Sequence, residues 1–135
     1  MINLKGEKMT KEFHMMNKRE ATEVMSMYFN VVRGSYLKDA LDSFARKEGY
    51  GQEVILISFD TDLDDYDQAQ LPKLLDKKHV LLELDYPAVE KDQIAYLDFR
   101  MFYEYLALNI VKIGNDSENK ELLKLLTKVK NGLNV

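Results

Sequence analysis

The residues with the clearest potential for chemistry form a short acidic run in the middle of the chain. Five of the eight residues at positions 60–67 are aspartates, and the run directly follows an apolar segment. Carboxylates at this density could bind a hard cation such as Ca²⁺ or Mg²⁺. A helix-loop-helix calcium site would require glycine and glutamate where Asp65 and Leu71 stand, so the sequence excludes that kind of site. The aspartates that could form a looser site for a divalent cation are Asp60, Asp62, Asp64, Asp65 and Asp67.

The rest of the sequence offers little for catalysis. It contains no cysteine, and its two histidines are His14, close to the N-terminus, and His79. His79 is the one candidate base in the expected domain, but no serine lies near it in sequence, and a lone histidine is typical of a protein surface. Gly49 and Gly51 lack the lysine and the spacing of a phosphate-binding loop. We therefore predict a protein without catalytic residues, cofactors or enzymatic activity.

The acidic residues are concentrated in one part of the chain. Residues 53–92 contain eleven acids and four lysines, a net charge of −7, so that the overall charge of −4 leaves +3 for the remainder. This separation indicates one negative surface, which would repel nucleic acid. The lysines near the C-terminus lack the aromatic residues and the motifs of a nucleic-acid-binding domain. We therefore expect no nucleic-acid partner, and a basic protein fits the acidic run and its embedded Tyr66 better.

Length and composition indicate one domain. The chain has 135 residues, of which 46% are hydrophobic and 31% are charged, as in globular proteins that bury a core without disulfides. Residues 1–15 show no clear period, so we expect an expression leader or a mobile arm there and a single domain over residues 16–135. No apolar run is long enough to span a membrane. The lack of cysteine is compatible with the cytoplasm, which is the expected location.

Apolar periodicity predicts two helices in the first part of the chain, followed by strands. Asn17 with Glu20 three residues later has the pattern of a capping box, which begins a helix that ends near Gly34. A second helix is expected from Ser35, as its cap, to Gly49. Strands are expected at residues 53–59, 79–86 and 93–97, and residues 60–78 are expected to form a long surface connection with room for one short helical turn.

Two further helices are expected in the last third of the chain. Asp98 can cap a largely apolar helix that ends at Gly114, and a final helix with a leucine stripe begins at Asn115 or Asp116. This order of elements predicts an α+β fold in which a small, mostly antiparallel sheet packs against about four helices. A parallel β-α-β unit is the weaker alternative, because residues 71–77 are too few for an ordinary crossover helix.

Several segments resemble a known family in their order along the chain. They are Leu41 with the residues FARKEGYG at 44–51, a strand with Ile57, Ser58 and Phe59, the aspartate-rich stretch, Leu97 and Asp98 followed by FYEYL at 102–106, and the leucine- and lysine-rich helix at 122–133. From Ser35 onward this order resembles the ribonuclease-toxin immunity proteins of bacterial contact-dependent growth inhibition systems. The resemblance implies that the protein binds and neutralises a cognate ribonuclease at the C-terminus of a toxin that neighbouring cells deploy.

The resemblance and the charge distribution suggest the same mechanism. A ribonuclease must present a basic cleft that binds phosphates, so an acidic surface could steer to that cleft, occupy it and exclude RNA. The alternative is a divalent-metal-binding protein, or a small metal-dependent enzyme, that uses the loop 60–67. A homotypic interface is a third possibility, and the oligomeric state stays open. The residues expected to contact the toxin are Asp62, Asp64, Asp65, Tyr66 and Asp67, with Glu83 and Asp85 beside them if their strand faces the same way.

Overall fold

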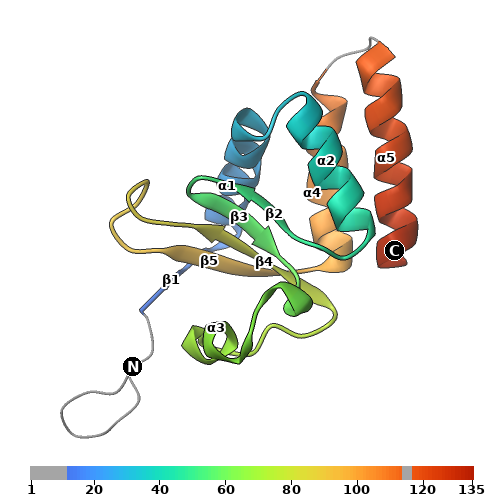
Figure 1. Cartoon of the computed structure of the whole chain (residues 1–135). Helices are drawn as coiled ribbons and strands as arrows, with labels where there is room; N and C mark the ends of the chain where they lie inside the picture. Colours follow the sequence, from blue (N-terminus) through green and yellow to red (C-terminus); the bar gives the residue numbers. More distant parts are fainter. Residues whose placement is uncertain (1–11, 114–116) are drawn as a thin grey trace, which may run out of the picture.

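The computed structural model describes residues 12–113 and 117–135. These residues form a sheet with helices on both sides (Figure 1). In chain order the elements are β1 (His14–Met15), α1 (Lys18–Val31), α2 (Ser35–Ala45), β2 (Tyr50–Gln52), β3 (Ile55–Ser58), the 3-10 helix η1 (Asp60–Asp62), α3 (Asp65–Gln70), β4 (His79–Leu84), β5 (Gln93–Asp98), α4 (Phe99–Val111) and α5 (Ser117–Leu133).

The five strands are arranged in the order β1-β5-β4-β3-β2. Strands β2 to β5 form an antiparallel meander, in which Leu82 of β4 pairs with Ile57 of β3 and with Ala95 of β5. Strand β1 is parallel to β5, and its His14 pairs with Gln93. The prediction of a mostly antiparallel sheet is therefore confirmed. His14 belongs to the stretch expected to be a leader or an arm, and the origin of that stretch stays a prediction.

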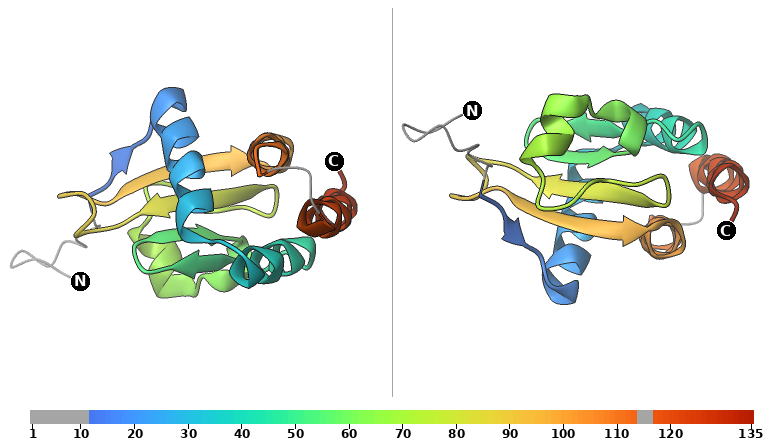
Figure 2. Two further views of the ribbon diagram at one scale, coloured as in Figure 1. Left: turned by 90° about the horizontal axis from the view of Figure 1, so that it is seen from above. Right: turned by 90° about the horizontal axis from the view of Figure 1, so that it is seen from below.

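The helices lie on the two faces of the sheet in unequal numbers. Helix α1 crosses one face, α2 and α4 lie on the same side, and α5 packs against α2 and α4 (Figures 1 and 2). The short helix α3 lies on the opposite face (Figure 2). The four long helices thus lie on one side of a small sheet, with α5 packed on α2 and α4 rather than on the strands, which confirms the predicted α+β class. The acidic segment between β3 and β4 packs on the other face of the sheet.

The main core lies between the sheet and the four long helices, with Phe44 of α2 near its centre. The ring centroid of Phe44 lies 5.1 Å from that of Phe102, 6.3 Å from that of Tyr28 and 6.4 Å from that of Phe59. All four side chains are almost fully buried. The Tyr28 hydroxyl donates a hydrogen bond to the Tyr50 carbonyl oxygen (3.0 Å), which satisfies the polar group that its burial removes from water.

The first predicted strand is a hairpin instead. Residues 53–59 were expected to form one strand, but β2 and β3 pair antiparallel around a turn at Glu53 and Val54, with Gln52 opposite Ile55. Glu53 has a φ of 55°, a value that a tight turn requires and that an extended strand does not allow. The run of apolar residues in the sequence thus identified β3, whereas the three residues of β2 show no apolar periodicity that could have predicted a strand.

The helix ends agree with the sequence in part. The capping box of α1 is confirmed, because Glu20 N donates to Asn17 Oδ1 (2.8 Å) and Asn17 N donates to Glu20 Oε1 (3.0 Å). The Asn17 hydrogen bond, helped by His14, lowers the pKa of Glu20. The predicted cap Ser35 is wrong by one position: Gly34, with a φ of 60°, precedes α2, and Ser35 is its first helical residue.

The second helix ends before the predicted glycine. Helix α2 stops at Ala45, and Lys47 rather than Gly49 has the positive φ, 58°. Gly49 is required for another reason, because a Cβ there would lie 2.3 Å from the Ile57 carbonyl oxygen. Its missing side chain therefore lets the chain pass close to β3 before β2 begins.

The last two helices match the prediction within the described part. Asp98 caps α4 by accepting a hydrogen bond from Met101 N (2.8 Å). The expected end at Gly114 and the expected starts at Asn115 or Asp116 lie outside the described residues. Across residues 12–113 and 117–135, no helix has both the length and the apolar character needed to span a membrane.

Helices α2 and α5 approach most closely at Gly132, and this contact leads to a prediction. A Cβ at Gly132 would lie 2.1 Å from the Ala45 carbonyl oxygen, so Gly132→Ala must force the two backbones apart. We expect the variant to lower the free energy of unfolding by about 1 to 3 kcal/mol, the usual cost of overpacking, although alanine favours a helix over glycine. Urea denaturation measures the change, and a variant as stable as the wild type would contradict the close approach.

Candidate functional site

The acidic run forms a compact projection on the face of the sheet opposite the long helices. It folds into the single turn η1 and the short helix α3, which lies below the sheet in Figure 1. Asp65 and Tyr66 in the first turn of α3 are exposed, and Tyr66 exposes 61% of its surface. The Asp65 carboxylate makes no hydrogen bond or ion pair with any described residue. These two residues of the expected contact surface are therefore free to meet a partner.

Three of the other predicted contact acids hold the backbone of the projection. Asp62 Oδ2 accepts hydrogen bonds from Phe59 N (2.7 Å) and from Gly49 N (2.8 Å), which ties η1 to the segment before β2. Asp64 Oδ1 accepts from Asp67 N (2.8 Å), and Asp67 Oδ2 lies 3.4 Å from Asp64 N, so the pair forms a capping box at α3. All three remain exposed and add negative charge to the surface while they shape it.

The projection is fastened to the sheet at its C-terminal side. The Gln68 side chain donates to the Leu75 carbonyl oxygen (3.0 Å) and accepts from Leu75 N (2.8 Å). Tyr96 of β5 donates its hydroxyl hydrogen to the Lys73 carbonyl oxygen (2.7 Å), and partial burial raises the pKa of Tyr96. Beneath these bonds a second small core is formed by Leu75, Leu81 and Ile94, with Leu63 and Leu71 packed on it. The acidic helix is thus held by the sheet rather than suspended in a loop.

His79, the one candidate base, has a structural partner. Its Nδ1 lies 2.7 Å from Asp76 Oδ1, and this hydrogen bond lowers the pKa of Asp76. Asp76 also accepts from Lys78 N (2.9 Å), so the carboxylate shapes the turn that leads into β4. His79 is therefore the first residue of β4, beside a surface turn, and its ring is bound to Asp76.

Glu83 and Asp85 lie in a separate group of carboxylates at the far end of β4. Side chains alternate along the strand, so Glu83 points to the same face as Leu81, which is the face that the acidic projection covers. Glu83, Asp85 and Asp92 each offer a carboxylate oxygen, and these oxygens lie within 4.8 Å of one another. Asp92 is buried, and its Oδ1 accepts a hydrogen bond from Tyr86 N (2.7 Å).

Asp92 is the residue of this group that sequence reasoning missed, although strand pairing could have found it. Leu84 of β4 pairs with Gln93 of β5, and this is the last pair before the loop that joins the two strands. The next residues on either side, Asp85 and Asp92, therefore lie opposite each other where the loop begins, a place that we call the hairpin mouth. Like charges opposite each other are unfavourable unless a cation balances them. Asp85 Oδ1 is buried and has no hydrogen-bond partner within the described residues, so it is the atom of this group that a donor from outside could satisfy.

The structure divides the seven predicted contact residues by role. Asp65 and Tyr66 are exposed and free, Asp62, Asp64 and Asp67 are exposed and fix the backbone, and Glu83 and Asp85 join Asp92 at the hairpin mouth. The loop 60–67 does not gather three carboxylates that could share a metal ion; within the described residues, the group at Glu83 is the one that does. The metal-binding alternative on that loop therefore gains no support.

The different roles of Asp62 and Asp65 can be tested by measuring the free energy of unfolding of single variants. Asp62→Ala leaves the backbone N–H groups of Phe59 and Gly49 without their partner, so we expect a loss of about 1 to 2 kcal/mol in the free energy of unfolding. Asp65→Ala removes the same charge without breaking a bond and should stay within about 0.5 kcal/mol of the wild type. Equal losses in thermal or urea denaturation would show that the two acids do not differ in role.

Taken together, these contacts define a small α+β scaffold that holds an exposed acidic projection on one face of its sheet. The chain was also compared with models of known protein families. The model of the CDI (contact-dependent growth inhibition) immunity protein family matches residues 21–112, which is more than half of the chain. The chain therefore belongs to the CDI immunity protein family, whose members neutralise a toxin by binding it and are in general not enzymes. The expected resemblance to immunity proteins of contact-dependent growth inhibition systems is thus confirmed, and the specificity for a ribonuclease toxin stays a prediction. The searches matched the chain to no curated protein and to no solved structure.

Proposed function

We propose that this protein neutralises a ribonuclease toxin by covering its RNA-binding cleft with the acidic surface around α3. The observation that supports this proposal best is the exposed pair Asp65 and Tyr66 on a helix that hydrogen bonds hold to the sheet. A fixed surface loses little conformational entropy on binding, which favours tight association. The partner is the cognate ribonuclease domain at the C-terminus of the exported toxin.

Charge and aromatic contact have different parts in this mechanism. A ribonuclease cleft is positively charged because it binds phosphates, so the carboxylates of the projection would accelerate the encounter. Tyr66 offers a large side chain with few rotatable bonds, the kind of residue that dominates binding energy at the centre of interfaces. The rate of association is thus assigned to the acids and the lifetime of the complex to the tyrosine.

The carboxylates at the hairpin mouth extend the same surface. Asp85 Oδ1 is buried and has no hydrogen-bond partner within the described residues. A lysine or arginine from the toxin would supply the missing donor to Asp85 Oδ1. Basic side chains of a phosphate-binding cleft are suited to this role.

An inhibitor of a ribonuclease toxin acts in the cytoplasm and does not bind nucleic acid. Its toxin degrades RNA inside the target cell, so the inhibitor has to meet it in the cytoplasm. A negative surface repels the phosphates of nucleic acid, which makes RNA a competitor for the toxin rather than a ligand of this protein. No catalytic step and no membrane contact is required, since occupation of the cleft is sufficient.

The direct test uses the C-terminal domain of the large exported protein encoded beside this gene. We expect a dissociation constant of about 1 nM by interferometry at low salt, weaker binding at high salt, and loss of the domain's ribonuclease activity at equimolar inhibitor. Binding without inhibition of RNA cleavage would reject cleft occlusion, and absence of binding at micromolar concentrations would reject the partner.

A further inference from the structure

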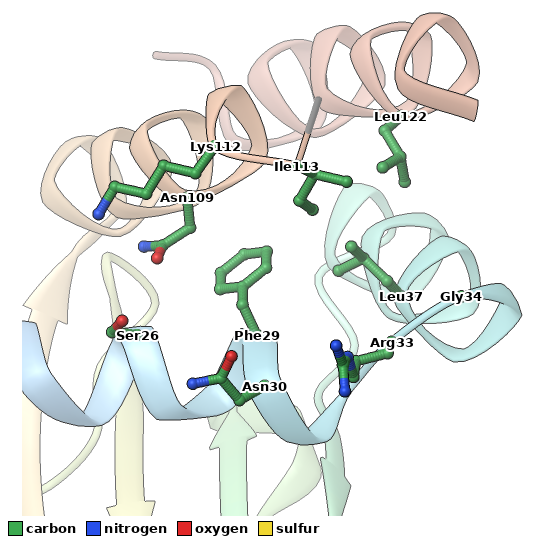
Figure 3. A pocket seen from close by; sticks show the side chains of 10 residues that line it. All are labelled: Ser26, Phe29, Asn30, Arg33, Gly34, Leu37, Asn109, Lys112, Ile113 and Leu122. Carbon is green, nitrogen blue, oxygen red and sulfur yellow. The ribbon is translucent and has the colours of Figure 1, made fainter. Parts of the chain in front are cut away.

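A pocket lies at the end of the molecule opposite α3. The last turns of α1 and α4 and the first turns of α2 and α5 meet there (Figure 1), and a cavity of about 360 Å³ opens between them (Figure 3). Pockets of roughly 300 to 1,000 Å³ are typical of small-molecule sites. None of the described residues that line the pocket belongs to the acidic surface around α3, so ligand binding here can be tested separately from the function proposed above.

The lining combines apolar walls with polar groups that lack partners. Leu37 and Leu122 are buried and form part of the wall, and the ring of Phe29 lies between them and the side chains of Asn109 and Lys112 (Figure 3). The polar side chains of Ser26, Asn30, Arg33 and Lys112 make no hydrogen bond or ion pair with any described residue. Open polar groups around an apolar wall are the usual arrangement of a ligand site.

The two cations of the pocket, Arg33 and Lys112, form no ion pair with any described residue. Arg33 follows α1 and Lys112 follows α4, and they lie on opposite sides of Phe29 and Asn109 in Figure 3. None of the described residues that line the pocket is acidic. By contrast, the cations that do form ion pairs within the described residues are Arg19, Lys38, Arg46, Lys91 and Lys128.

Asn109 adds a buried polar group that a ligand can reach. Its side chain is 7% exposed and points toward the pocket (Figure 3), while its Nδ2 donates to the Tyr105 carbonyl oxygen (2.8 Å). This bond leaves Oδ1 as an acceptor to which no described residue donates. Water completes this acceptor, because a carboxylate has no hydrogen to donate to it, and the Asn109 amide serves as a probe of the pocket rather than as a ligand-binding group.

We propose that this pocket binds an organic dianion, in which an apolar or aromatic body separates two carboxylates. The body would lie against Phe29, and the carboxylates would meet Arg33 and Lys112 on either side. Arginine presents a planar pair of donors that matches a carboxylate, and lysine supplies a point charge. The same chemistry occurs in a small dicarboxylic acid and in a protein segment with two acidic side chains, and the experiment separates these sources.

The test titrates three related probes into the full-length protein and follows the Asn109 side-chain amide and the Phe29 ring by NMR. Isophthalate has two carboxylates, benzoate has one, and benzyl alcohol has none. We expect isophthalate to bind with a dissociation constant of about 1 mM, benzoate to bind about tenfold more weakly, and benzyl alcohol to cause no saturable shift. Similar shifts for all three probes, or shifts that do not centre on the pocket, would overturn the proposal.

Variants at the two cations give a second measurement. Arg33→Gln and Lys112→Gln should each weaken isophthalate binding about tenfold, the size of one lost charged hydrogen bond. Arg100→Gln is the matched control, because Arg100 is exposed on α4 and does not line the pocket. If isophthalate binds all three variants as it binds the wild type, the assignment of the pocket is wrong.

Binding of the toxin domain identifies the natural source of the carboxylates. If Arg33→Gln weakens isophthalate binding and leaves toxin affinity unchanged, the ligand is a free small molecule. If toxin affinity also falls about tenfold, acidic side chains of the toxin occupy the pocket. Both results support the proposed chemistry, which the probe series tests separately from the acidic surface.

Discussion

Replacing Phe44 by alanine is expected to lower the free energy of unfolding by about 3 to 5 kcal/mol. Phe44 is fully buried, and its ring contacts those of Tyr28, Phe59 and Phe102 from α1, the segment after β3, and α4. The substitution therefore opens a cavity where three parts of the core meet, and the backbone around it cannot close without moving the sheet. A domain of this size has only about 5 to 15 kcal/mol of stability, so a large share would be lost.

Urea denaturation followed by circular dichroism measures this loss, and Tyr36→Ala is the matched control. Tyr36 is an aromatic residue on the same helix, but it exposes 56% of its surface and should change stability by no more than about 0.5 kcal/mol. Equal effects of the two substitutions would mean that Phe44 is not the centre of the core. Toxin binding at a temperature where the Phe44 variant is folded should stay unchanged, because Phe44 does not reach the surface.

The parts of the fold that sequence predicted well are those fixed by local pattern. The stripe that begins at Ala21 in α1 repeats with the period of a helix, so its buried face follows from spacing alone. In β4 the alternation gave only the face of Val80, Leu82 and Leu84, because Leu81 is buried on the other face by the acidic segment. The caps at Asn17 and Asp98 were likewise predicted, since each bonds an amide three residues away. A residue that bonds so locally needs no knowledge of the rest of the chain.

The parts that sequence missed depend on pairing between distant segments. Strand β2 has three residues around Gly51 and no periodicity, and it exists because Tyr50 pairs with Ile57 and Gln52 with Ile55. Gly49 was identified as special but for the wrong reason, because the clash that excludes a side chain comes from Ile57. Close approaches of this kind arise from the fold, and no local pattern predicts them.

The same division applies to the site. Composition alone identified the acidic run, and charge counting showed that the middle of the chain is negative. The role of each acid depends instead on which amide it reaches: Asp62 bonds to Gly49, thirteen residues earlier in the chain, whereas Asp65 bonds to no described side chain. Spacing along the loop could not have separated these two residues, although one fixes the backbone and the other is free to bind.

Replacing Tyr66 by alanine is expected to weaken toxin binding about thirtyfold, mostly through faster dissociation, which corresponds to a hot spot of about 2 kcal/mol. The side chain is 61% exposed on a helix that Gln68 fastens to Leu75, so its loss removes contact area without disturbing the fold. Asp65→Asn should instead slow association and reduce its dependence on salt, because the variant removes one exposed charge and no structural bond.

Each variant has a control that preserves its chemistry at another place on the surface. Tyr36→Ala removes an equally exposed tyrosine from α2, and Glu104→Gln removes an exposed charge from α4, so neither should change the kinetics. Kinetic interferometry at two salt concentrations separates the two rates, and melting temperatures within about 2 °C of the wild type confirm that the variants are folded. If Tyr66→Ala and Asp65→Asn bind like the wild type while toxin and inhibitor still associate tightly, the complex uses another face. Unchanged binding of Asp65→Asn with loss of binding in Tyr66→Ala would keep α3 as the contact and remove electrostatic steering from the mechanism.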